Sequence, residues 1–434
     1  MFETLKSKIL NKNAKIGIIG LGYVGLPLAV AFAKKGFKVW GIDIDKDRVA
    51  RLKKGQSYIL DLKPQDIVTL QKDRSIVFTS DLSTIKKLDA FIICVPTPLL
   101  KTKEPDVSFI ISATELIKKH IKHGQVVVLE STTYPGTTEE VVLPILESTG
   151  LKECQDFYLA FSPERIDPGN TKYFVTNIPK VVGGISGCST EIAKLLYEQI
   201  IDKVMVVSSS RAAEMTKLLE NTFRIVNLGL VNELTRMCDK LDINIWEVIE
   251  AAKTKPYGFM PFYPGPGVGG HCIPIDPLYL SWKAKQYGFE ARFIDLASEV
   301  NNHMPHYVIE KLISGLNDRK KPVKGSRILI AGVAYKKDVQ DLRESPAFEI
   351  IDLLKKLGAK VSYYDPYFSY FKVDGIDLKC VKFDKKTLKY FDCVVIVTDH
   401  SNVDYRFIAK NSKMIVDTRN ALKGVKNRTN IILL

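Results

Sequence analysis

An N-terminal segment constrains the fold more than any other part of the chain. An almost continuously apolar run at 15–19 leads directly into residues 20–25, which read G-L-G-Y-V-G, and a helical pattern follows at 26–33. A second apolar run at 39–42 ends in Asp43. Such runs are typical of buried parallel strands. The glycine spacing is a weak signal by itself, but strand, glycine turn, helix, strand and terminal acid together predict a dinucleotide-binding βαβ unit.

Each glycine of this turn has an expected task. Gly20 permits the tight turn, Gly22 lets backbone amides approach a pyrophosphate, and Gly25 brings the helix against the strand. The phosphates then lie at a helix N-terminus, where N–H groups and the dipole favour anions. Asp43 is expected to bind a ribose diol and to repel a 2′-phosphate, which favours NAD over NADP; otherwise it is a strand-end turn residue. The expected cofactor-binding residues are Gly20, Gly22, Tyr23, Val24, Gly25, Asp43, Arg48, Pro96, Thr97 and Thr132.

Two further strand-like runs end in hydroxyl side chains. Residues 90–98 pass from an apolar stretch into a proline turn that holds Thr97, and residues 126–133 end with Ser131 and Thr132 among the last three. Ligands bind at the carboxyl edge of doubly wound sheets, so these hydroxyls are candidates for contact with cofactor or substrate. Capping of a following helix is an equally good interpretation.

Polar side chains in two other segments suit proton transfer. An S-P-E-R turn follows an apolar strand and presents Glu164, a candidate acid or base. Apolar residues then recur at three- and four-residue steps, which predicts one long helix from Ser210 to about Leu241. Lys217 and Asn221 share one face of that helix and could hold a substrate hydroxyl during deprotonation. Both features are also common on ordinary solvated surfaces, and the helices that follow could form a dimer interface.

A loop rich in glycine and proline presents one thiol. Residues 263–277 contain four glycines and four prolines, which exclude an uninterrupted helix or a central strand. The loop presents Cys272, with Asp276 four residues later. A thiolate is a strong nucleophile that favours acylation through a thioester. The alternative is a structural turn with an inert cysteine.

The last part of the chain predicts a second strand–turn–helix system. The polar stretch at 317–325 is typical of a linker, and apolar runs begin again at 327. This part has no complete G-x-G-x-x-G, so a second dinucleotide site of the same kind is not expected. We expect an α/β protein with two Rossmann-like doubly wound parallel-sheet domains, joined by a helical central domain with one long helix. The expected domains are 1–205 for NAD, 206–315 for the helical and dimerising part, and 316–434 for the substrate.

Composition excludes several classes of protein. With 46% hydrophobic and 26% charged residues in 434, the chain reads as a globular protein of two or three domains. No apolar run approaches the roughly 18 residues of a membrane span, and no signal-peptide pattern is evident. The seven cysteines are scattered without a C-x-x-C pair, so we expect neither a disulfide scaffold nor a metal site, and a reducing cytoplasm fits best.

The charge of the chain predicts anionic partners. The formal net charge is +14, which suits either nucleic acid or a phosphorylated metabolite. The lysines are spread through the whole sequence, whereas a DNA-binding stripe is more often concentrated on one helix or arm. We therefore expect no nucleic-acid partner and no membrane partner.

Taken together, these residues resemble the UDP-glucose/GDP-mannose dehydrogenase family of nucleotide-sugar 6-dehydrogenases, along nearly the whole chain. The resemblance implies a UDP-sugar substrate and a homodimer. It implies Cys272 as nucleophile, with Asp276, Thr132, Glu164, Lys217 and Asn221 as further catalytic residues. The family's K-x-D-x-x-D-x-R-E-S signature is present from Lys336 to Ser345, and its arginine, Arg343, is expected at the sugar nucleotide.

The sequence at the thiol departs from the UDP-glucose branch. Enzymes for UDP-glucose usually read G-G-S-C-F-x-K-D, whereas this chain reads G-G-H-C-I-P-I-D from Gly269. That form is similar to the branch acting on UDP-N-acetylhexosamines, with UDP-GlcNAc preferred here and UDP-glucose as the alternative. His271 either tunes the thiolate or touches the substrate, or else points away. The expected substrate-binding residues are Glu164, Arg165, Lys217, Asn221, Tyr263, Gly267, Gly269, His271, Lys336 and Arg343.

The implied reaction is a four-electron oxidation at C6 of the sugar, with two NAD per substrate. An aldehyde held as a Cys272 thiohemiacetal would become a thioester and then a uronate, which suits a precursor of surface polysaccharide or glycan. The rival from another class is a two-electron β-hydroxyacid dehydrogenase. That rival shares the N-terminal fold and the Lys–Asn pair but needs neither the loop cysteine nor the second nucleotide-type domain.

Overall fold

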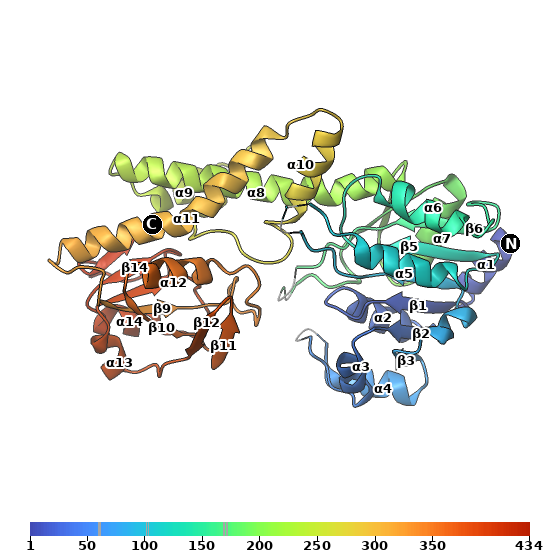
Figure 1. Ribbon diagram of the computed structural model, residues 1–434, viewed down its shortest axis with the longest axis horizontal. Coiled ribbons are helices and arrows are strands. Elements are labelled where there is room, and N and C mark those ends of the chain that lie inside the picture. The colour runs from blue at the N-terminus through green and yellow to red at the C-terminus, as the bar shows by residue number, and fades with distance from the viewer. Residues whose placement is uncertain (60–61, 101, 103, 168–169, 171) are drawn as a thin grey trace. The chain divides into compact units, whose positions relative to one another are not determined.

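The computed structural model describes residues 1–59, 62–100, 102, 104–167, 170 and 172–434 (Figure 1). The chain forms two compact units. The first unit comprises Met1–Glu220 and Leu278–Phe289, and the second comprises Asn221–Pro277 and Glu290–Leu434. The division into three domains expected from the sequence stays a prediction. Within the described residues, no helix combines the length and the apolar content that crossing a membrane requires.

The first unit is built on an eight-stranded sheet in the order β3-β2-β1-β4-β5-β6-β7-β8. Its strands are β1 (Lys15–Ile19), β2 (Lys38–Ile42), β3 (Ile76–Thr79), β4 (Ala90–Ile93), β5 (Gln125–Leu129), β6 (Phe157–Phe161), β7 (Lys180–Gly184) and β8 (Val204–Val206). Neighbouring strands are parallel except for β6 and β7, which pair antiparallel. The expected doubly wound sheet is thus confirmed, with one reversed strand that the sequence pattern does not indicate.

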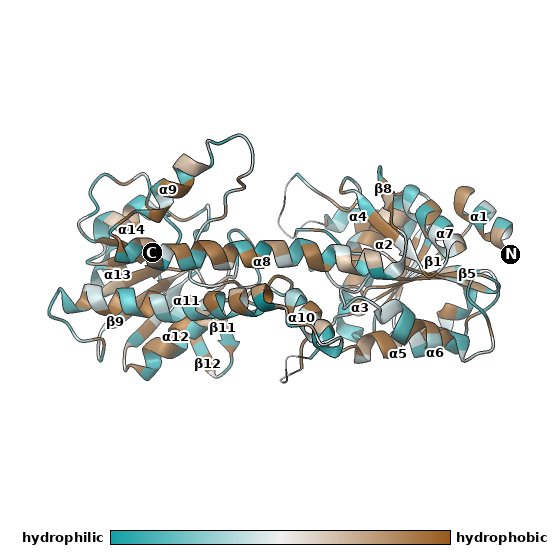
Figure 2. Cartoon of the chain, turned by 90° about the horizontal axis from the view of Figure 1, so that it is seen from above, coloured by the Kyte–Doolittle hydropathy of each residue, from teal (hydrophilic) through white to brown (hydrophobic). Residues whose placement is uncertain are grey.

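Helices cover both faces of this sheet. They are α1 (Phe2–Leu10), α2 (Gly25–Lys34), α3 (Lys46–Lys53), α4 (Pro64–Lys72), α5 (Ser108–Lys118), α6 (Leu143–Glu147) and α7 (Gly187–Glu198), with short helical turns at Leu82–Lys87 and Thr138–Val142. Alternate residues of β5 belong to two separate hydrophobic clusters: Val126 and Val128 pack with α2 and α7, while Val127 and Leu129 pack with α5 and α6. The central strands are accordingly apolar on both faces (Figure 2).

The second unit has its own parallel sheet, in the order β10-β9-β13-β14-β15. These strands are β9 (Arg327–Ala331), β10 (Lys360–Tyr364), β13 (Cys393–Ile396), β14 (Ile415–Asp417) and β15 (Ile431–Leu433), beside a hairpin of β11 (Tyr370–Val373) and β12 (Ile376–Lys379). Ile328 and Ile330 pack with α11 (Arg292–Asn317) and α12 (Pro346–Lys356). Leu329 and Ala331 pack with α13 (Lys385–Tyr390) and α14 (Tyr405–Asn411) on the other face. The second Rossmann-like sheet is therefore confirmed.

The expected long helix is α8, which runs from Ser210 to Lys240 over 31 residues. Two other helices follow it along the chain before α11: α9 (Ile245–Ala252) and α10 (Asp276–Gln286). Helix α11 continues through Pro305 over 26 residues. The helical segment between the two sheets in the sequence is thus confirmed.

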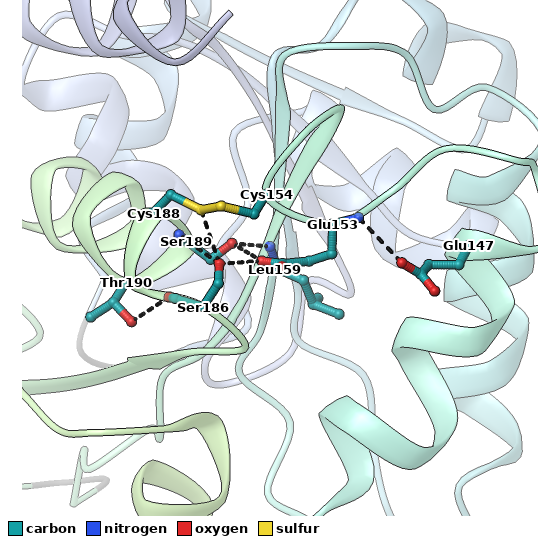
Figure 3. Close-up of a disulfide and its surroundings, with 8 residues drawn as sticks. All are labelled: Glu147, Glu153, Cys154, Leu159, Ser186, Cys188, Ser189 and Thr190. Atoms are coloured by element: carbon teal, nitrogen blue, oxygen red, sulfur yellow. Dashed lines mark hydrogen bonds between the residues drawn. A yellow bond between two sulfur atoms is a disulfide. The ribbon is translucent and has the colours of Figure 1, made fainter.

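One disulfide changes the interpretation of the cysteines as scattered residues without a disulfide scaffold. Cys154 is bonded to Cys188, with Cα atoms 6.0 Å apart, and neighbouring Ser186 donates a hydrogen bond of 2.7 Å to Glu153 (Figure 3). The reversal of β7 explains the pairing, because it places the start of α7 beside the start of β6. Spacing along the sequence gave no sign of that reversal. Because disulfides are rare in reducing compartments, the cysteines no longer favour such a compartment for this protein.

Candidate active site

The glycine turn of the first unit has the geometry of a phosphate cradle. Gly20 has φ +94°, and a Cβ there would lie 2.4 Å from the carbonyl oxygen of Cys94. A Cβ on Gly25 would lie 1.9 Å from the carbonyl oxygen of Gly20, so only glycine lets the start of α2 pack this closely. A Cβ on Gly22 would meet nothing within 4 Å, which leaves open space beside the turn.

The start of α2 is suited to an anion. Val24 is the N-cap residue, and no side chain among the described residues caps the helix. The N–H of Leu26 donates to the carbonyl of Gly22 at 3.2 Å and Pro27 has no N–H, so a pyrophosphate beside the open space at Gly22 would be bound by N–H groups of the turn that precedes them. Tyr23 lies in the same turn with 41% of its surface exposed. These residues fit NAD.

Asp43 lies at the end of β2, where it is 6% exposed. One carboxylate oxygen accepts hydrogen bonds from the backbone N–H of Leu21 at 2.8 Å and from Arg48 at 2.9 Å. The other accepts from the N–H of Asp45 at 2.9 Å. The carboxylate is thus fixed against the glycine turn, with Arg48 beside it. A carboxylate offers about four acceptor sites, so capacity remains for a ribose hydroxyl.

The hydroxyls at the neighbouring strand ends join two loops. Thr97 donates a hydrogen bond of 2.6 Å to the carbonyl of Thr132, and the hydroxyl of Ser131 donates one of 2.8 Å to the carbonyl of Val95. Neither Thr97 nor Ser131 caps a helix, so that alternative is wrong for both. Thr132 is partly exposed, and Pro96 is exposed at the same edge.

Glu164 is held at the carboxyl edge of the sheet and is 9% exposed. One of its oxygens accepts the backbone N–H groups of Arg165 and Ile166, each at 2.7 Å. The guanidinium of Arg165 is engaged elsewhere, in a two-bond ion pair with Glu220 at 2.6 and 3.2 Å. The interpretation of Glu164 as an ordinary solvated surface residue is therefore wrong. A role for Arg165 at the substrate stays a prediction.

The polar pair of α8 is buried. Lys217 and Asn221 are each 8% exposed. Asn221 donates a short hydrogen bond to Asp276, the first residue of α10, which is 3% exposed. The alternative of a solvated helix face is therefore wrong for these two residues.

The glycine-rich loop leaves Cys272 exposed. The carbonyl of Cys272 accepts the N–H groups of Ile275 at 3.1 Å and Asp276 at 2.8 Å, so the turn that carries the thiol leads directly into α10. Earlier in the loop, the N–H of Gly265 donates to the side chain of Asn232 at 3.0 Å. The loop is thus tied to helices before and after the thiol.

The same loop packs against the turn at 335–345 within the second unit. The N–H of Gly270 donates to the carbonyl of Arg343 at 3.1 Å. A Cβ on Gly269 would lie 2.6 Å from the carbonyl oxygen of Glu344, and one on Gly270 would lie 2.7 Å from the ring of Tyr335. Two motifs about seventy residues apart in sequence therefore form one surface. Gly267 reaches its conformation with φ +130°, which strongly favours glycine.

Charged groups surround His271 at this junction. Burial lowers the pKa of His271 below its usual value, and the positive charge of Arg343 adds to the effect, partly offset by Asp341. Arg343 donates to both oxygens of Asp341, at 2.6 and 3.0 Å. Both effects, burial and the charge of Arg343, favour the neutral form of the His271 imidazole. Lys336 lies in the same turn and is partly exposed.

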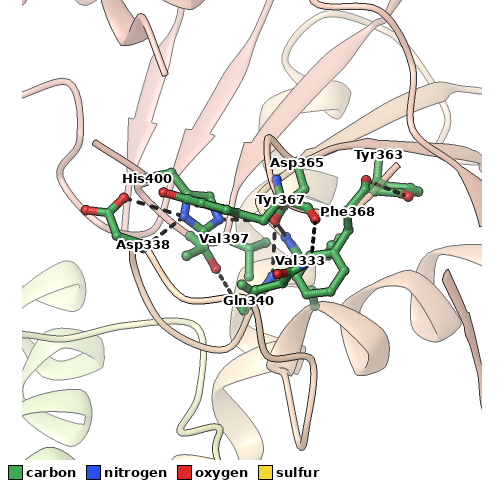
Figure 4. Close-up of polar contacts among 12 residues, drawn as sticks. Val333, Asp338, Gln340, Tyr363, Asp365, Tyr367, Phe368, Val397 and His400 are labelled. Carbon is green, nitrogen blue, oxygen red and sulfur yellow. Dashed lines mark hydrogen bonds and ion pairs between the residues drawn. The ribbon is translucent and has the colours of Figure 1, made fainter. Parts of the chain in front are cut away.

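A buried histidine anchors this turn (Figure 4). His400 accepts the backbone N–H of Asp338 at 3.0 Å through Nδ1, and its Nε2 lies 3.1 Å from Asp365. Asp365 also accepts the N–H of Val333 at 2.7 Å and of Tyr367 at 2.8 Å. Burial would raise the pKa of Asp365, but the bonds from His400 and the two N–H groups outweigh it and hold that pKa below its usual value.

A cavity of about 610 Å³ lies in the second unit. Tyr263 and Trp246 form a stacked pair in its wall, with ring centroids 6.1 Å apart, and Arg419 also lines it. A Cβ on Gly265 would lie 2.5 Å from Arg419, so this arginine backs the loop directly. Arg419 and His400 were not predicted from the sequence. The one available signal was their position just after the strands β14 and β13.

The expected catalytic residues divide between the two units. Thr132, Glu164 and Lys217 belong to the first, and Asn221, Cys272 and Asp276 belong to the second. The structure brings Asn221 and Asp276 together by a hydrogen bond and ties Asp276 to the turn of Cys272. Across the described part of the chain, no group of three or more His, Cys, Asp or Glu residues could hold a metal ion.

Comparison with protein families agrees with this geometry along most of the chain. Three models of the UDP-glucose/GDP-mannose dehydrogenase family match: its NAD binding domain at residues 14–201, its central domain at 211–303 and its UDP binding domain at 329–424. The chain belongs to the UDP-glucose/GDP-mannose dehydrogenase family. The glycine turn of this dehydrogenase lies in the NAD-binding match, and the turn at 335–345 lies in the UDP-binding match.

Similar proteins support the same assignment. UDP-N-acetyl-D-glucosamine 6-dehydrogenase of Pseudomonas aeruginosa is 39% identical over 360 residues, which cover 82% of this chain and 84% of that protein. UDP-N-acetyl-D-mannosamine dehydrogenase of Methanococcus maripaludis is 37% identical, covering 94% and 93%. The structure of UDP-D-ManNAc dehydrogenase from Pyrococcus horikoshii aligns with TM-score 0.88 at 32% identity, covering 96% and 98%. The dehydrogenase is thus an NAD-dependent oxidoreductase of UDP-sugars.

Proposed function

We propose that this dehydrogenase oxidises the C6 hydroxyl of a UDP-N-acetylhexosamine to the uronate, with UDP-GlcNAc as the first candidate. The observation that carries the proposal is the exposed thiol of Cys272, on a loop that packs against the turn of the UDP-binding part. The G-G-H-C-I-P-I-D sequence at the thiol favours an N-acetylhexosamine over glucose. Relatives named for GlcNAc and for ManNAc are similarly distant, so UDP-ManNAc is the nearest competitor and UDP-glucose the next.

In this proposal, the residues of α8 and the loop manage the first proton and the aldehyde. Bound NAD supplies the hydride acceptor for both oxidations. Asp276 takes up the hydroxyl proton at C6, directly or through a water, and Lys217 assists the transfer. The Cys272 sulfur forms a bond to the aldehyde carbon, and Lys217 and Asn221 stabilise the resulting oxyanion. Asn221 suits that task because its amide already donates to Asp276 and is therefore fixed in direction.

Release of the product uses water and a base. A water oxygen bonds to the thioester carbon, its proton passes to Glu164, and the carbon–sulfur bond breaks to leave the Cys272 thiolate and the uronic acid. Thr132 helps to place the water. Glu164 suits the role of base because two backbone N–H groups fix one of its oxygens while the side chain lies at the strand edge. Holding the aldehyde covalently lets one protein carry out both oxidations without releasing it.

Counting the NADH formed per sugar tests the proposal against its main rival. Purified protein is incubated with NAD and limiting UDP-GlcNAc, UDP-ManNAc, UDP-GalNAc or UDP-glucose. Two NADH per sugar consumed, together with a uronate identified by mass, support the proposal; one NADH per sugar indicates a two-electron dehydrogenase. Cys272→Ser is expected to abolish uronate formation. Normal uronate formation by that variant refutes the covalent scheme.

We also propose that the protein acts as a homodimer that supplies a precursor for surface polysaccharide or glycan in the cytoplasm. A capsule-type relative, Protein CapL of Staphylococcus aureus, is 37% identical over 425 residues and supports the pathway class. The exposed apolar side of α8 supports the dimer, because Phe223, Leu230 and Met237 recur at seven-residue steps and are 48%, 54% and 50% exposed. A repeat of this kind forms one stripe along a helix.

A further inference from the structure

Two buried charged residues of the first unit, Lys180 and Glu130, have no role in the proposed reaction. Lys180 is 5% exposed and Glu130 is 1% exposed. The Lys180 ammonium lies 3.0 Å from one oxygen of Glu130 and 3.4 Å from the oxygen of Glu164 that the backbone does not hold. Tyr197, fully buried on α7, donates a short hydrogen bond to the same oxygen of Glu130 and places its ring 5.3 Å from the ammonium.

The reversed strand of the sheet creates this cluster. Glu130 directly follows β5, and Glu164 lies three residues beyond β6, both at the carboxyl edge. Strand β7 runs against β6, with Ala160 opposite Gly184 and Phe161 opposite Gly183. The same register carried three residues further brings Glu164 level with Lys180. A parallel β7 would have begun at the opposite edge of the sheet, so the antiparallel pairing is what delivers an ammonium to Glu164.

The electrostatics of the cluster favour a charged lysine. Burial alone would lower the pKa of Lys180, but the negative charges of Glu130 and Glu164 outweigh it and raise that pKa. Burial raises the pKa of Glu130, against the opposing effect of Lys180. The second oxygen of Glu130 is buried without a hydrogen-bond partner among the described residues. A buried ion pair is a poor source of stability, since removing both charges from water offsets most of their attraction, so another reason for keeping it is expected.

We propose that Lys180, held by Glu130, is a positioning residue that fixes the Glu164 carboxylate for the hydrolysis of the thioester. This inference rests on the proposed role of Glu164. Two backbone N–H groups orient one oxygen of Glu164, and Lys180 holds the other, so the carboxylate cannot rotate away. The titratable groups that interact electrostatically with it are Lys180 from β7, Glu130 after β5, Cys94 after β4 and Tyr197 from α7. Lys180 supplies the positive charge among them.

Trapping the acyl-enzyme tests the inference. Wild type, Glu164→Gln, Lys180→Met and Lys180→Arg are mixed with NAD and with UDP-GlcNAc or UDP-ManNAc, whichever gives turnover, and the intact protein is weighed by mass spectrometry. Lys180→Met is expected to slow hydrolysis about 100-fold, the scale of a positioned general base, and to accumulate the acyl group on Cys272 after a burst of two NADH. Lys180→Arg is expected to restore most of the rate. Tyr197→Phe is the matched control, because it removes a buried hydrogen bond of the cluster but leaves Lys180 beside Glu164.

The outcomes separate this inference from the proposed function. If Glu164→Gln accumulates no adduct, the role of Glu164 fails, and the inference fails with it. If Glu164→Gln accumulates the adduct but Lys180→Met turns over like wild type, the inference alone is overturned. A purely structural role predicts similar losses in Lys180→Met and Tyr197→Phe.

The pH profile of hydrolysis gives a second readout, which does not depend on Lys180→Met folding. Glu130→Gln removes a negative charge near Glu164, so the acid limb of the profile is expected to move to lower pH. Lys180→Met removes a positive charge and is expected to move the limb to higher pH. An unmoved acid limb in a folded Glu130→Gln variant contradicts the inference.

Discussion

Glu214 shows how burial alone can make a single residue sensitive to pH. It lies on α8 with no exposed surface, and its carboxylate accepts the N–H groups of Gly136 and Thr138 and the hydroxyl of Thr138 at 2.7 Å. Burial raises the pKa of Glu214 to about 7, although these hydrogen bonds act in the opposite direction. The turn at 134–138 thus depends on a group that changes charge near neutral pH.

The stability of the protein is expected to fall as this group ionises. The unfolded chain ionises Glu214 near the ordinary glutamate pKa of 4.5, whereas burial in the folded chain raises the pKa of Glu214 to about 7. The stabilisation is therefore fully present below about pH 4.5 and is lost as pH rises through about 7. Relative to Glu214→Gln, wild type should lose about 3 kcal/mol of unfolding free energy over that window, at about 1.4 kcal/mol per pKa unit. Urea unfolding of both proteins from pH 5 to 8 measures the difference.

A neighbouring carboxylate supplies the control. The side chain of Glu139 is 47% exposed, so Glu139→Gln should leave the dependence of the unfolding free energy on pH as it is in wild type. Stability curves of wild type and Glu214→Gln that stay parallel across the window would show that Glu214 ionises normally in the folded protein.

At the scale of elements, the sequence predicted the strands, turns and helices that depend on neighbouring residues alone. The strand at 15–19, the glycine turn and the helix from Ser210 were all foreseen, because apolar periodicity and glycine geometry are properties of neighbouring residues. The direction of β7 was not foreseen, since strand pairing is settled by contacts between distant segments. Both the Lys180 cluster and the disulfide at Cys188 follow from that single reversal. His400 was missed for the same reason, because its partners come from other turns.

The turn at 335–345 is expected to lose its shape without His400. His400→Ala removes the acceptor for the Asp338 N–H and one donor to the buried Asp365, so about 1–3 kcal/mol of unfolding free energy should be lost. We expect the dissociation constant for UDP to rise about tenfold, equivalent to about 1.4 kcal/mol of binding energy. Titration calorimetry of the cofactor-free protein with UDP measures that constant. His123→Ala changes a histidine with a 61% exposed side chain in the first unit and should leave UDP binding unaltered. Equal UDP affinity in folded His400→Ala and wild type would argue against the anchor.

At the scale of the whole molecule, the resemblance gave the family and the sequence patterns gave both sheets. The contacts that hold the second unit together could not be predicted from the sequence. Gly269 and Gly270 were foreseen as loop residues, but their packing against Tyr335 and Glu344 depends on how the loop and the turn meet. Arg419 behind Gly265 is a similar case. Sequence spacing constrains which residues share an element, whereas contacts between elements are settled by the packing of the complete fold.

The assembly of two copies is the largest-scale prediction. Phe223, Leu230 and Met237 form an apolar stripe on α8 that water solvates poorly, and Leu241, 59% exposed, directly follows the helix. A two-fold dimer uses the same patch on both copies, and a stable one buries about 800 Å² on each. Leu230→Asp puts a charge in the middle of the stripe, where burial without a partner would cost several kcal/mol. Sedimentation velocity should therefore find wild type dimeric and Leu230→Asp monomeric at micromolar concentration. Lys356→Glu, whose side chain on α12 is 71% exposed, should stay dimeric. A dimer that persists in Leu230→Asp would place the interface on another surface, and a monomeric wild type would remove the dimer from the proposal.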